Sequence, residues 1–381
     1  MPNILTLNKI AKIGLDEFPQ GYVCGDSAEH PAAILVRSAS LHETPLPESL
    51  LAIARAGAGV NNVPIETCTQ QGICVFNTPG ANANAVKELV IASLFLSSRK
   101  VAEGIAWCKT LKGEGENVGK LVEKGKGAFG GPEIFGKTLG LIGLGAIGGL
   151  VANAAAALGM RVIGVDPYLS SAAKAQLSPD VELTDDLDAL LGRSDYISLH
   201  APLTAETKGS VNAAFFAKAK PGVRVLNFSR ADLVNSGDLL AALASGQCAA
   251  YVTDFPTDDL IGAAGVTAIP HLGASTPESE DNCAIMAARQ VTAYLERGEV
   301  KNSVNLPATE LPADFTTRVC VIHKASEAVP AVLQQALPAG LVSQTRGSVS
   351  YTVADFGGDA GVDPGTIAAI DGVLRVRVLR R

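Results

Sequence analysis

The chain has 381 residues, of which 47% are hydrophobic and 18% charged, with a formal net charge of −7. This composition is typical of a folded α/β protein with two or three domains, and it excludes an intrinsically disordered chain. The acidic balance argues against nucleic acid as a partner, although a few local arginines can still bind an anionic substrate. The N-terminus lacks an apolar leader and no apolar run reaches about 18 residues, so we expect a cytoplasmic protein without a membrane partner.

The seven cysteines are scattered and form neither a Cys-x-x-Cys pair nor a cluster with histidine. An odd number of cysteines without a pattern is typical of reduced thiols in an intracellular protein. We therefore expect neither disulfides nor a metal site.

The first hundred residues alternate short apolar runs with helical patterns. Residues 32–38 read as a buried strand, and residues 46–57, "LPESLLAIARAG", as a helix that ends on Gly57. Residues 72–80, "GICVFNTPG", predict another strand closed by a Pro-Gly turn. Residues 82–101 carry the apolar stripe of a long helix.

Residues 109–133 are rich in glycine and lysine, which predicts an exposed connection between domains. From Lys137 onward, unbroken apolar runs alternate with helical segments, as in a doubly wound parallel sheet. Residues 277–298 predict one more helix. The last part of the chain, 316–381, reads as a small separate α+β unit.

A glycine-rich turn, "GLGAIG", follows the first of these apolar runs. Gly143 permits a tight turn, Gly145 lets backbone N–H groups approach a pyrophosphate, and Gly148 lets helix and strand pack closely. Asp166 ends the next strand, where a dinucleotide fold needs a carboxylate for the ribose hydroxyls. The spacing predicts a site for NAD rather than NADP, because this carboxylate repels a 2′-phosphate.

Three further strand ends bring polar residues to the same edge of the expected sheet. His271 follows the last strand and can exchange a proton with a substrate, and Arg230 can bind a carboxylate. Asp254, Asp258 and Asp259 follow a third strand, and one of them can pair with the imidazole. Each residue alone is more often a surface or capping residue, but together they predict a catalytic crevice.

Six segments, in order, resemble the D-isomer-specific 2-hydroxyacid dehydrogenase family. They are "RAGAGVNNVP", "NANAVKE", "GKTLGLIGLGAIG", "HAPLTAETKG", "LNFSRADLVN" and "PHLGASTPESEDNCA", and the match covers residues 32–308. The resemblance implies a flavodoxin-like substrate domain of residues 1–98 and 277–308, with a Rossmann-type NAD-binding domain of residues 99–276 inserted in it. Residues 316–381 resemble an ACT regulatory domain, which binds serine in several of these enzymes.

The resemblance assigns Arg230 to the substrate carboxylate, His271 to proton transfer and Asp258 to pairing with His271. The family has a glutamate where Asp258 stands, and its ribose-side aspartate falls on Thr253, with Asp254 displaced by one position. The implied cofactor contacts are Gly143, Gly145, Ala146, Ile147, Gly148, Asp166, Pro202, Phe228, Ser229, Asp254, Gly273 and Ala274. The implied substrate contacts are Arg37, Arg55, Ala58, Gly59 and Asn82.

The resemblance implies NAD-dependent oxidation of 3-phospho-D-glycerate to 3-phosphohydroxypyruvate, the first step of phosphorylated serine biosynthesis, by a homodimer or homotetramer. One alternative keeps the chemistry but uses glyoxylate, hydroxypyruvate or another small 2-oxo acid. Arg37 and Arg55 favour a phosphorylated substrate, because a phosphate dianion needs more positive charge. A second alternative is a non-catalytic NAD-sensing protein of the corepressor type, against which the catalytic residues argue.

Overall fold

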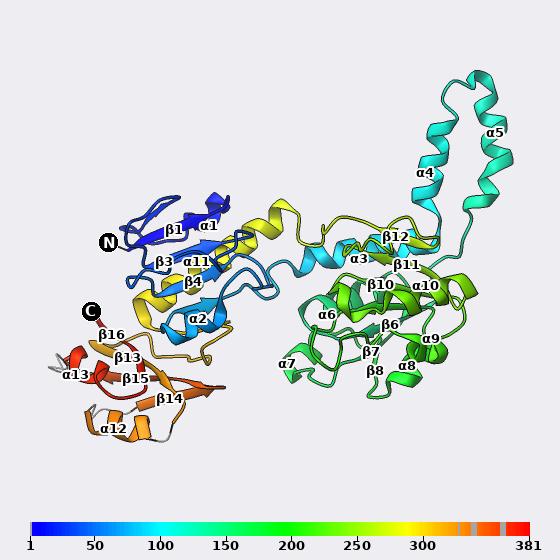
Figure 1. Cartoon of the computed structure of the whole chain (residues 1–381). Helices are drawn as coiled ribbons and strands as arrows, with labels where there is room; N and C mark the ends of the chain where they lie inside the picture. Colours follow the sequence, from blue (N-terminus) through cyan, green and yellow to red (C-terminus); the bar gives the residue numbers. More distant parts are fainter. Residues whose placement is uncertain (1, 327, 337–340, 359–362) are drawn as a thin grey trace. The chain divides into compact units, whose positions relative to one another are not determined.

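The computed structural model describes residues 2–326, 328–336, 341–358 and 363–381. The chain forms two compact units, the first made of Met1–Asn82 and Pro277–Arg381 and the second of Ala83–Thr276 (Figure 1). Two parallel α/β sheets and a C-terminal antiparallel sheet confirm the expected fold class.

The first unit contains a five-stranded parallel sheet in the order β2-β1-β3-β4-β5, which is the flavodoxin-like order. Successive residues of its central strands alternate between two apolar cores. Leu35 and Ala54 contribute to the core beneath α11, whereas Ile34 and Ile53 contribute to the core beneath α2. The elements are β1 (Asn3–Leu7), α1 (Lys12–Leu15), β2 (Val23–Gly25), β3 (Ala33–Val36), β4 (Ala52–Arg55), α2 (Ile65–Gln70), β5 (Cys74–Phe76) and α11 (Pro277–Arg297).

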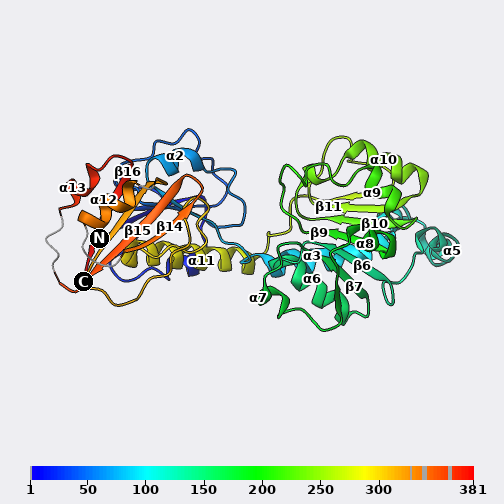
Figure 2. The ribbon, with the colours of Figure 1, turned by 90° about the horizontal axis from the view of Figure 1, so that it is seen from below.

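The second unit contains a seven-stranded parallel sheet in the order β12-β11-β10-β9-β6-β7-β8. Counted from β6, this is the doubly wound 3-2-1-4-5-6 arrangement with β12 added at one edge. One apolar core lies under α3 and α6, and the other under α8, α9 and α10, so helices cover both faces (Figure 2). The strands are β6 (Thr138–Ile142), β7 (Arg161–Val165), β8 (Val181–Leu183), β9 (Tyr196–Leu199), β10 (Val223–Asn227), β11 (Cys248–Thr253) and β12 (Val266–Ala268).

Two helices of the second unit, α4 and α5, stand away from the sheet as a hairpin (Figure 1). Neither helix contains a buried residue. The α-helices of this unit are α3 (Ala83–Ser98), α4 (Val101–Thr110), α5 (Val118–Gly125), α6 (Ala146–Ala157), α7 (Ser171–Lys174), α8 (Leu187–Arg193), α9 (Ala213–Lys218) and α10 (Ser236–Ser245). Short 3₁₀ helices span Gly115–Asn117, Lys126–Phe129 and Ala231–Leu233.

The C-terminal part of the first unit is a βαββαβ arrangement whose antiparallel strands lie in the order β14-β15-β13-β16. One face of this sheet lies under α12 and α13, and the other shares the core of the parallel sheet and α11. Its elements are β13 (Thr317–Lys324), α12 (Ala328–Ala336), β14 (Leu341–Arg346), β15 (Val349–Phe356), α13 (Pro364–Ala368) and β16 (Val373–Arg380).

This sheet also provides hydrogen-bond donors for the C-terminal end of α11. Arg377 donates to the carbonyl oxygens of Tyr294 and Leu295 at 3.1 and 2.8 Å. The Arg318 guanidinium donates to the carbonyl of Arg297 at 2.7 Å, and the Tyr351 hydroxyl donates to that of Gly298, also at 2.7 Å. These donors satisfy carbonyls that a helix end leaves unpaired, and two of them place positive charge at the negative end of the helix dipole.

The structure corrects several local expectations. The helix expected over residues 46–57 is wrong, because Ala52–Arg55 form the buried strand β4. The stretch 109–133 is mostly exposed as expected, but much of it is helical, and it lies within the second unit rather than between the two units. Strands β1, β2, β8 and β14 were not expected from the sequence.

The division into two units also differs from the boundaries expected from the sequence. The first boundary lies between Asn82 and Ala83, so α3 belongs to the second unit. The C-terminal sheet is grouped with the first unit, although one face of it forms a separate hydrophobic cluster with α12 and α13. No helix in the described part of the chain is long and apolar enough to cross a bilayer.

Candidate active site

The glycine-rich turn joins β6 to α6 in the second unit. Gly143 has a φ of +94°, and a Cβ there would lie 2.8 Å from the carbonyl of His200. A Cβ at Gly148 would lie 2.1 Å from the carbonyl oxygen of Gly143. These two positions therefore need glycine for the turn and for close packing.

Gly145 differs from its two neighbours in the motif. It is the N-cap of α6, ahead of Ala146 and Ile147, and a Cβ there would meet no atom within 4 Å. The protein itself therefore does not require glycine at this position. The missing side chain leaves open space beside the N-terminus of a 12-residue helix, where backbone N–H groups favour an anion.

Asp166 lies at the carboxyl end of β7 and is half-buried. Its Oδ2 accepts the backbone N–H of Leu144 at 2.8 Å, and its Oδ1 accepts that of Tyr168 at 2.9 Å. The carboxylate thus fixes the glycine-rich turn. Each oxygen retains a lone pair that can accept a ribose hydroxyl.

Asp254, directly after β11, is a buried carboxylate. Its Oδ2 accepts the backbone N–H of Gly273 at 2.9 Å, whereas its Oδ1 is buried without a hydrogen-bond partner among the described residues. Burial raises the pKa of the Asp254 carboxyl, and the Gly273 hydrogen bond and the charge of His271 act in the opposite direction. An unpaired buried acceptor is costly, so a ligand that brings an N–H donor fits here.

His271 lies in the loop between β12 and α11 and is exposed. Its ring packs against Phe255 with 4.6 Å between the ring centroids. Phe255 follows Asp254, so the segment directly after β11 supplies both a packing surface for the imidazole and a nearby negative charge. Ala274, which follows Gly273 in the same loop, is half-buried.

Arg230 lies beyond the carboxyl end of β10 with an exposed side chain. Asn227 holds its backbone in place, because the Nδ2 of Asn227 donates to the carbonyl of Arg230 at 2.8 Å. The neighbouring Ser229 donates its hydroxyl to the carbonyl of Ala201 at 2.6 Å, and Phe228 is buried in the core under α3. Pro202 lies in the exposed loop after β9.

Asp258 is not paired with His271 in the structure. It is exposed in the turn after Pro256 and makes no ion pair with a described residue. Asp259, its neighbour, accepts a hydrogen bond from the Thr257 hydroxyl at 2.5 Å. Of the three acids, Asp254 is the one that is buried.

The first unit brings a separate group of charged residues together where β3 and β4 end. The Nε of Arg55 donates to the carbonyl oxygen of Arg37 at 3.0 Å. Nη1 of Arg37 lies 2.7 Å from Oε1 of Glu280 in the first turn of α11. Burial raises the pKa of the Cys283 thiol in α11, and the charges of Arg55 and Arg37 act in the opposite direction.

The other expected substrate residues lie in the same unit. Ala58 is exposed, and its carbonyl accepts the Nδ2 of Asn77 at 2.7 Å. Gly59 and Asn82 are half-buried. The sequence analysis missed Glu280, because no local pattern identifies the ion-pair partner of a distant arginine.

The sequence and fold resemble those of known proteins. Residues 91–273 match the family model described as D-isomer specific 2-hydroxyacid dehydrogenase, NAD binding domain. The chain is 36% identical over 327 residues to the D-3-phosphoglycerate dehydrogenase of Mycobacterium tuberculosis, covering 84% of this chain and 59% of that protein. It is 31% identical over 351 residues to the enzyme of that name from Synechocystis, covering 90% and 60%. The chain thus spans less than two thirds of the length of these relatives.

One solved structure is the NAD⁺-bound 3-phosphoglycerate dehydrogenase of Entamoeba histolytica. It aligns with a TM-score of 0.61 at 25% identity, covering 80% of this chain and 98% of that one. The open space at Gly145 and the unpaired Oδ1 of Asp254 are consistent with the same cofactor. Residues 91–273 of this chain are therefore similar to the NAD-binding domain of D-isomer specific 2-hydroxyacid dehydrogenases.

Proposed function

We propose that this chain is an NAD-dependent dehydrogenase that oxidises 3-phospho-D-glycerate to 3-phosphohydroxypyruvate, the first step of phosphorylated serine biosynthesis. The observation that carries the proposal is the set of strand ends in the second unit, where the glycine-rich turn, Arg230, Asp254 and His271 follow parallel strands of one sheet. The identity of 36% to D-3-phosphoglycerate dehydrogenases supports the substrate.

In the proposed reaction, Arg230 holds the substrate carboxylate and His271 accepts the proton of the C2 hydroxyl. Bound NAD supplies the acceptor for the hydride that leaves C2. The O–H and C2–H bonds break, the C2=O double bond forms, and the proton remains on His271. We propose Asp258 as the carboxylate that stabilises the imidazolium, on the basis of the resemblance, and Asp254 as a cofactor contact.

We propose that Arg37 and Arg55 bind the phosphate group of the substrate. Arg37 and Arg55 lie at neighbouring strand ends, where the Arg55 guanidinium contacts the backbone of Arg37, and together they supply the charge that a dianion needs. Asn82 and the Ala58–Gly59 turn are proposed to contact the rest of the substrate. In this assignment the parallel sheet of the first unit binds substrate and the C-terminal βαββαβ part is regulatory and ACT-like.

The Arg37–Glu280 ion pair supports a second candidate function. Because Glu280 neutralises one of the two arginines, the site also fits a monoanion without phosphate, such as glyoxylate or hydroxypyruvate, in the reductive direction. The proposed dehydrogenase chemistry is the same for both substrates.

The test is a substrate screen of the purified chain that follows NADH absorbance. We expect NAD reduction with 3-phospho-D-glycerate and much less with unphosphorylated D-glycerate. His271→Ala should lower kcat by about 10²–10⁴-fold while NADH binding, followed by fluorescence, stays nearly intact. NADH binding without turnover on any of these acids would instead favour a non-catalytic NAD sensor.

A further inference from the structure

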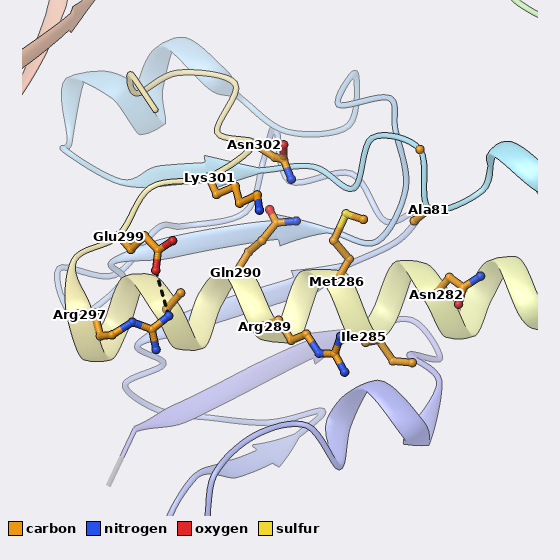
Figure 3. A pocket seen from close by; sticks show the side chains of 12 residues that line it. Ala81, Asn282, Ile285, Met286, Arg289, Gln290, Arg297, Glu299, Lys301 and Asn302 are labelled. Carbon is orange, nitrogen blue, oxygen red and sulfur yellow. Dashed lines mark hydrogen bonds and ion pairs between the residues drawn. The ribbon is translucent and has the colours of Figure 1, made fainter. Parts of the chain in front are cut away.

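A pocket of about 460 Å³ lies in the first unit, against the side of α11 that faces away from the shared core (Figure 3). Ile285, Met286 and Arg289 contribute from α11, Gly80 and Ala81 from the segment that leads into α3, and Lys301 and Asn302 from the segment after α11. Pockets of this volume accommodate small metabolites. None of the residues proposed above to contact substrate or NAD lines this pocket.

Gln290 carries an unsatisfied hydrogen-bond acceptor in this wall. Its side chain is only 7% exposed, and Figure 3 shows it extending from α11 toward the segment of Lys301 and Asn302. Its Nε2 donates to the carbonyl of Asn77 at 3.2 Å, whereas its Oε1 has no hydrogen-bond partner among the described residues. A buried amide oxygen without a donor is destabilising, so the position fits a ligand with an N–H or O–H group.

The pocket also has a positive charge that the fold does not neutralise. Arg289 is held by Glu17 through two hydrogen bonds, and Arg297 pairs with Glu299 at 2.9 Å. Lys301, by contrast, is exposed and forms no ion pair in the described part of the chain. An ammonium group of this kind can bind a carboxylate.

Asn302, next to Lys301, has a left-handed backbone. Its φ is +56°, a conformation that asparagine adopts more readily than most residues other than glycine, and its carbonyl accepts the N–H of Asn77 at 3.4 Å. Asn77 therefore connects both sides of the pocket, because its own carbonyl accepts the Gln290 amide. Asn302 and the unpaired acceptor of Gln290 are thus connected through the backbone of Asn77.

We propose that this pocket binds a small amino- or hydroxy-carboxylate. Its carboxylate would pair with Lys301, and its ammonium or hydroxyl group would donate to Oε1 of Gln290. The pocket includes the two residues that precede Asn82, where the chain leaves the first unit, and α11, where the chain returns to it. A bound ligand therefore joins the two segments through which the chain crosses between the units.

The proposal can be tested by calorimetry on the NAD-free 381-residue chain with L-serine, D-glycerate and inorganic phosphate as separate probes. We expect L-serine or D-glycerate to bind with one-to-one stoichiometry and phosphate to bind at least tenfold more weakly, because phosphate lacks a donor group joined through carbon to a separate carboxylate. Lys301→Ala and Gln290→Met should each weaken binding by about tenfold. Lys9→Ala removes an exposed lysine elsewhere in the same unit and should change nothing.

Arg230→Ala separates this pocket from the proposed active site. Binding that survives Arg230→Ala but is lost in Lys301→Ala supports the proposal whether or not the chain oxidises 3-phospho-D-glycerate. The proposal is overturned if neither acid binds. It is also overturned if binding is unaffected by both pocket variants, or if it disappears in Arg230→Ala.

Discussion

The backbone N–H of Gly273 donates a 2.9 Å hydrogen bond to Oδ2 of Asp254. This bond joins the end of β11 to the loop that carries His271. A Cβ at Gly273 would approach the same carboxylate oxygen to 3.1 Å, so the contact leaves little room for a larger residue. The imidazole is therefore positioned partly by a backbone contact two residues away.

Replacing Asp254 should weaken cofactor binding. Asp254→Asn can still accept the Gly273 N–H, but it can place a donor where the buried, unpaired Oδ1 now lies. We expect the Kd for NADH to rise about tenfold in a fluorescence titration, because that acceptor no longer meets a donor of the ligand. Asp259→Asn, on an exposed neighbour, is the control, and equal affinities in wild type and Asp254→Asn would contradict the assignment.

The preference for NAD over NADP should depend on the charge of Asp166. Asp166→Asn retains an acceptor for the Leu144 N–H but removes the negative charge, whereas Asp166→Ala removes both. We expect both variants to raise the NADP-to-NAD ratio of kcat/KM by about tenfold, because a 2′-phosphate is no longer repelled. If the NADP-to-NAD ratio of kcat/KM changes only in Asp166→Ala, the cofactor preference depends on the geometry of the glycine-rich turn rather than on the charge of Asp166.

Glu280 should oppose the binding of a phosphorylated substrate. Its carboxylate lies 2.7 Å from Nη1 of Arg37, so a substrate anion competes with it for the guanidinium group. We expect Glu280→Gln to lower KM for 3-phospho-D-glycerate by roughly threefold to tenfold at low salt and less at high salt. Glu278→Gln, in the same helical turn, is the matched control, and an equal effect on D-glycerate would exclude a phosphate-specific role.

His200 should make the folded state less stable in mild acid. Burial lowers its pKa to about 4, and its Nε2 lies 2.9 Å from the Ser198 hydroxyl oxygen. In the unfolded chain the pKa of this histidine is about 6.5. Between that pH and the lower pKa of the folded state, the unfolded chain binds a proton at His200 that the folded chain does not. This contribution to stability is complete above about pH 6.5 and is lost as the pH falls toward 4, by up to about 3 kcal/mol.

Denaturant unfolding at several pH values measures this effect. His200→Asn removes the titrating group, so the free energy of unfolding should fall less steeply between about pH 6.5 and pH 4 than in wild type. His30→Asn, at an exposed site, should follow the wild-type curve. If the free energy of unfolding of His200→Asn falls as steeply with decreasing pH as that of the wild type, groups other than His200 cause the acid sensitivity.

The α4–α5 hairpin should bind a second copy of the chain. Val101, Ile105 and Val118 on these helices are 43%, 55% and 37% exposed, although the helices contain no buried residue. Apolar side chains gathered on an element without its own core are typical of protein interfaces. We expect a homodimer or homotetramer in light scattering, and Ile105→Lys combined with Val118→Lys should shift it toward smaller species. Ile261→Lys, 63% exposed elsewhere in the second unit, is the control.

The sequence was sufficient to predict the fold where periodicity and glycine spacing were unambiguous. The alternation of apolar runs and helices after Lys137 predicted the doubly wound sheet, and Gly143, Gly145 and Gly148 lie in the expected turn. Residues 46–57 were misassigned because a short apolar run fits either a helix or a strand that is buried on both faces. β14 is polar and mostly exposed, so it lacks the apolar pattern of a core strand.

The site was less predictable, because contacts between loops are not encoded in local spacing. The sequence indicated that three acids follow β11, but only the structure shows that Asp254 is buried and bound to Gly273. The ion pair of Arg37 with Glu280 joins residues far apart in the chain. Such pairs depend on how elements pack, which a single sequence does not specify.

The hydrogen-bond donors that β13, β15 and β16 provide to the end of α11 limit where the chain can be truncated without loss of stability. Arg318, Tyr351 and Arg377 satisfy the last carbonyls of that helix, and Cys320 and Ile322 fill the core beneath it. A chain that stopped before β13 would expose this core and leave buried carbonyls to water. Although its βαββαβ topology suggests an appended module, the C-terminal segment shares its hydrophobic core with α11, so we expect its removal to destabilise the parallel sheet of the first unit as well.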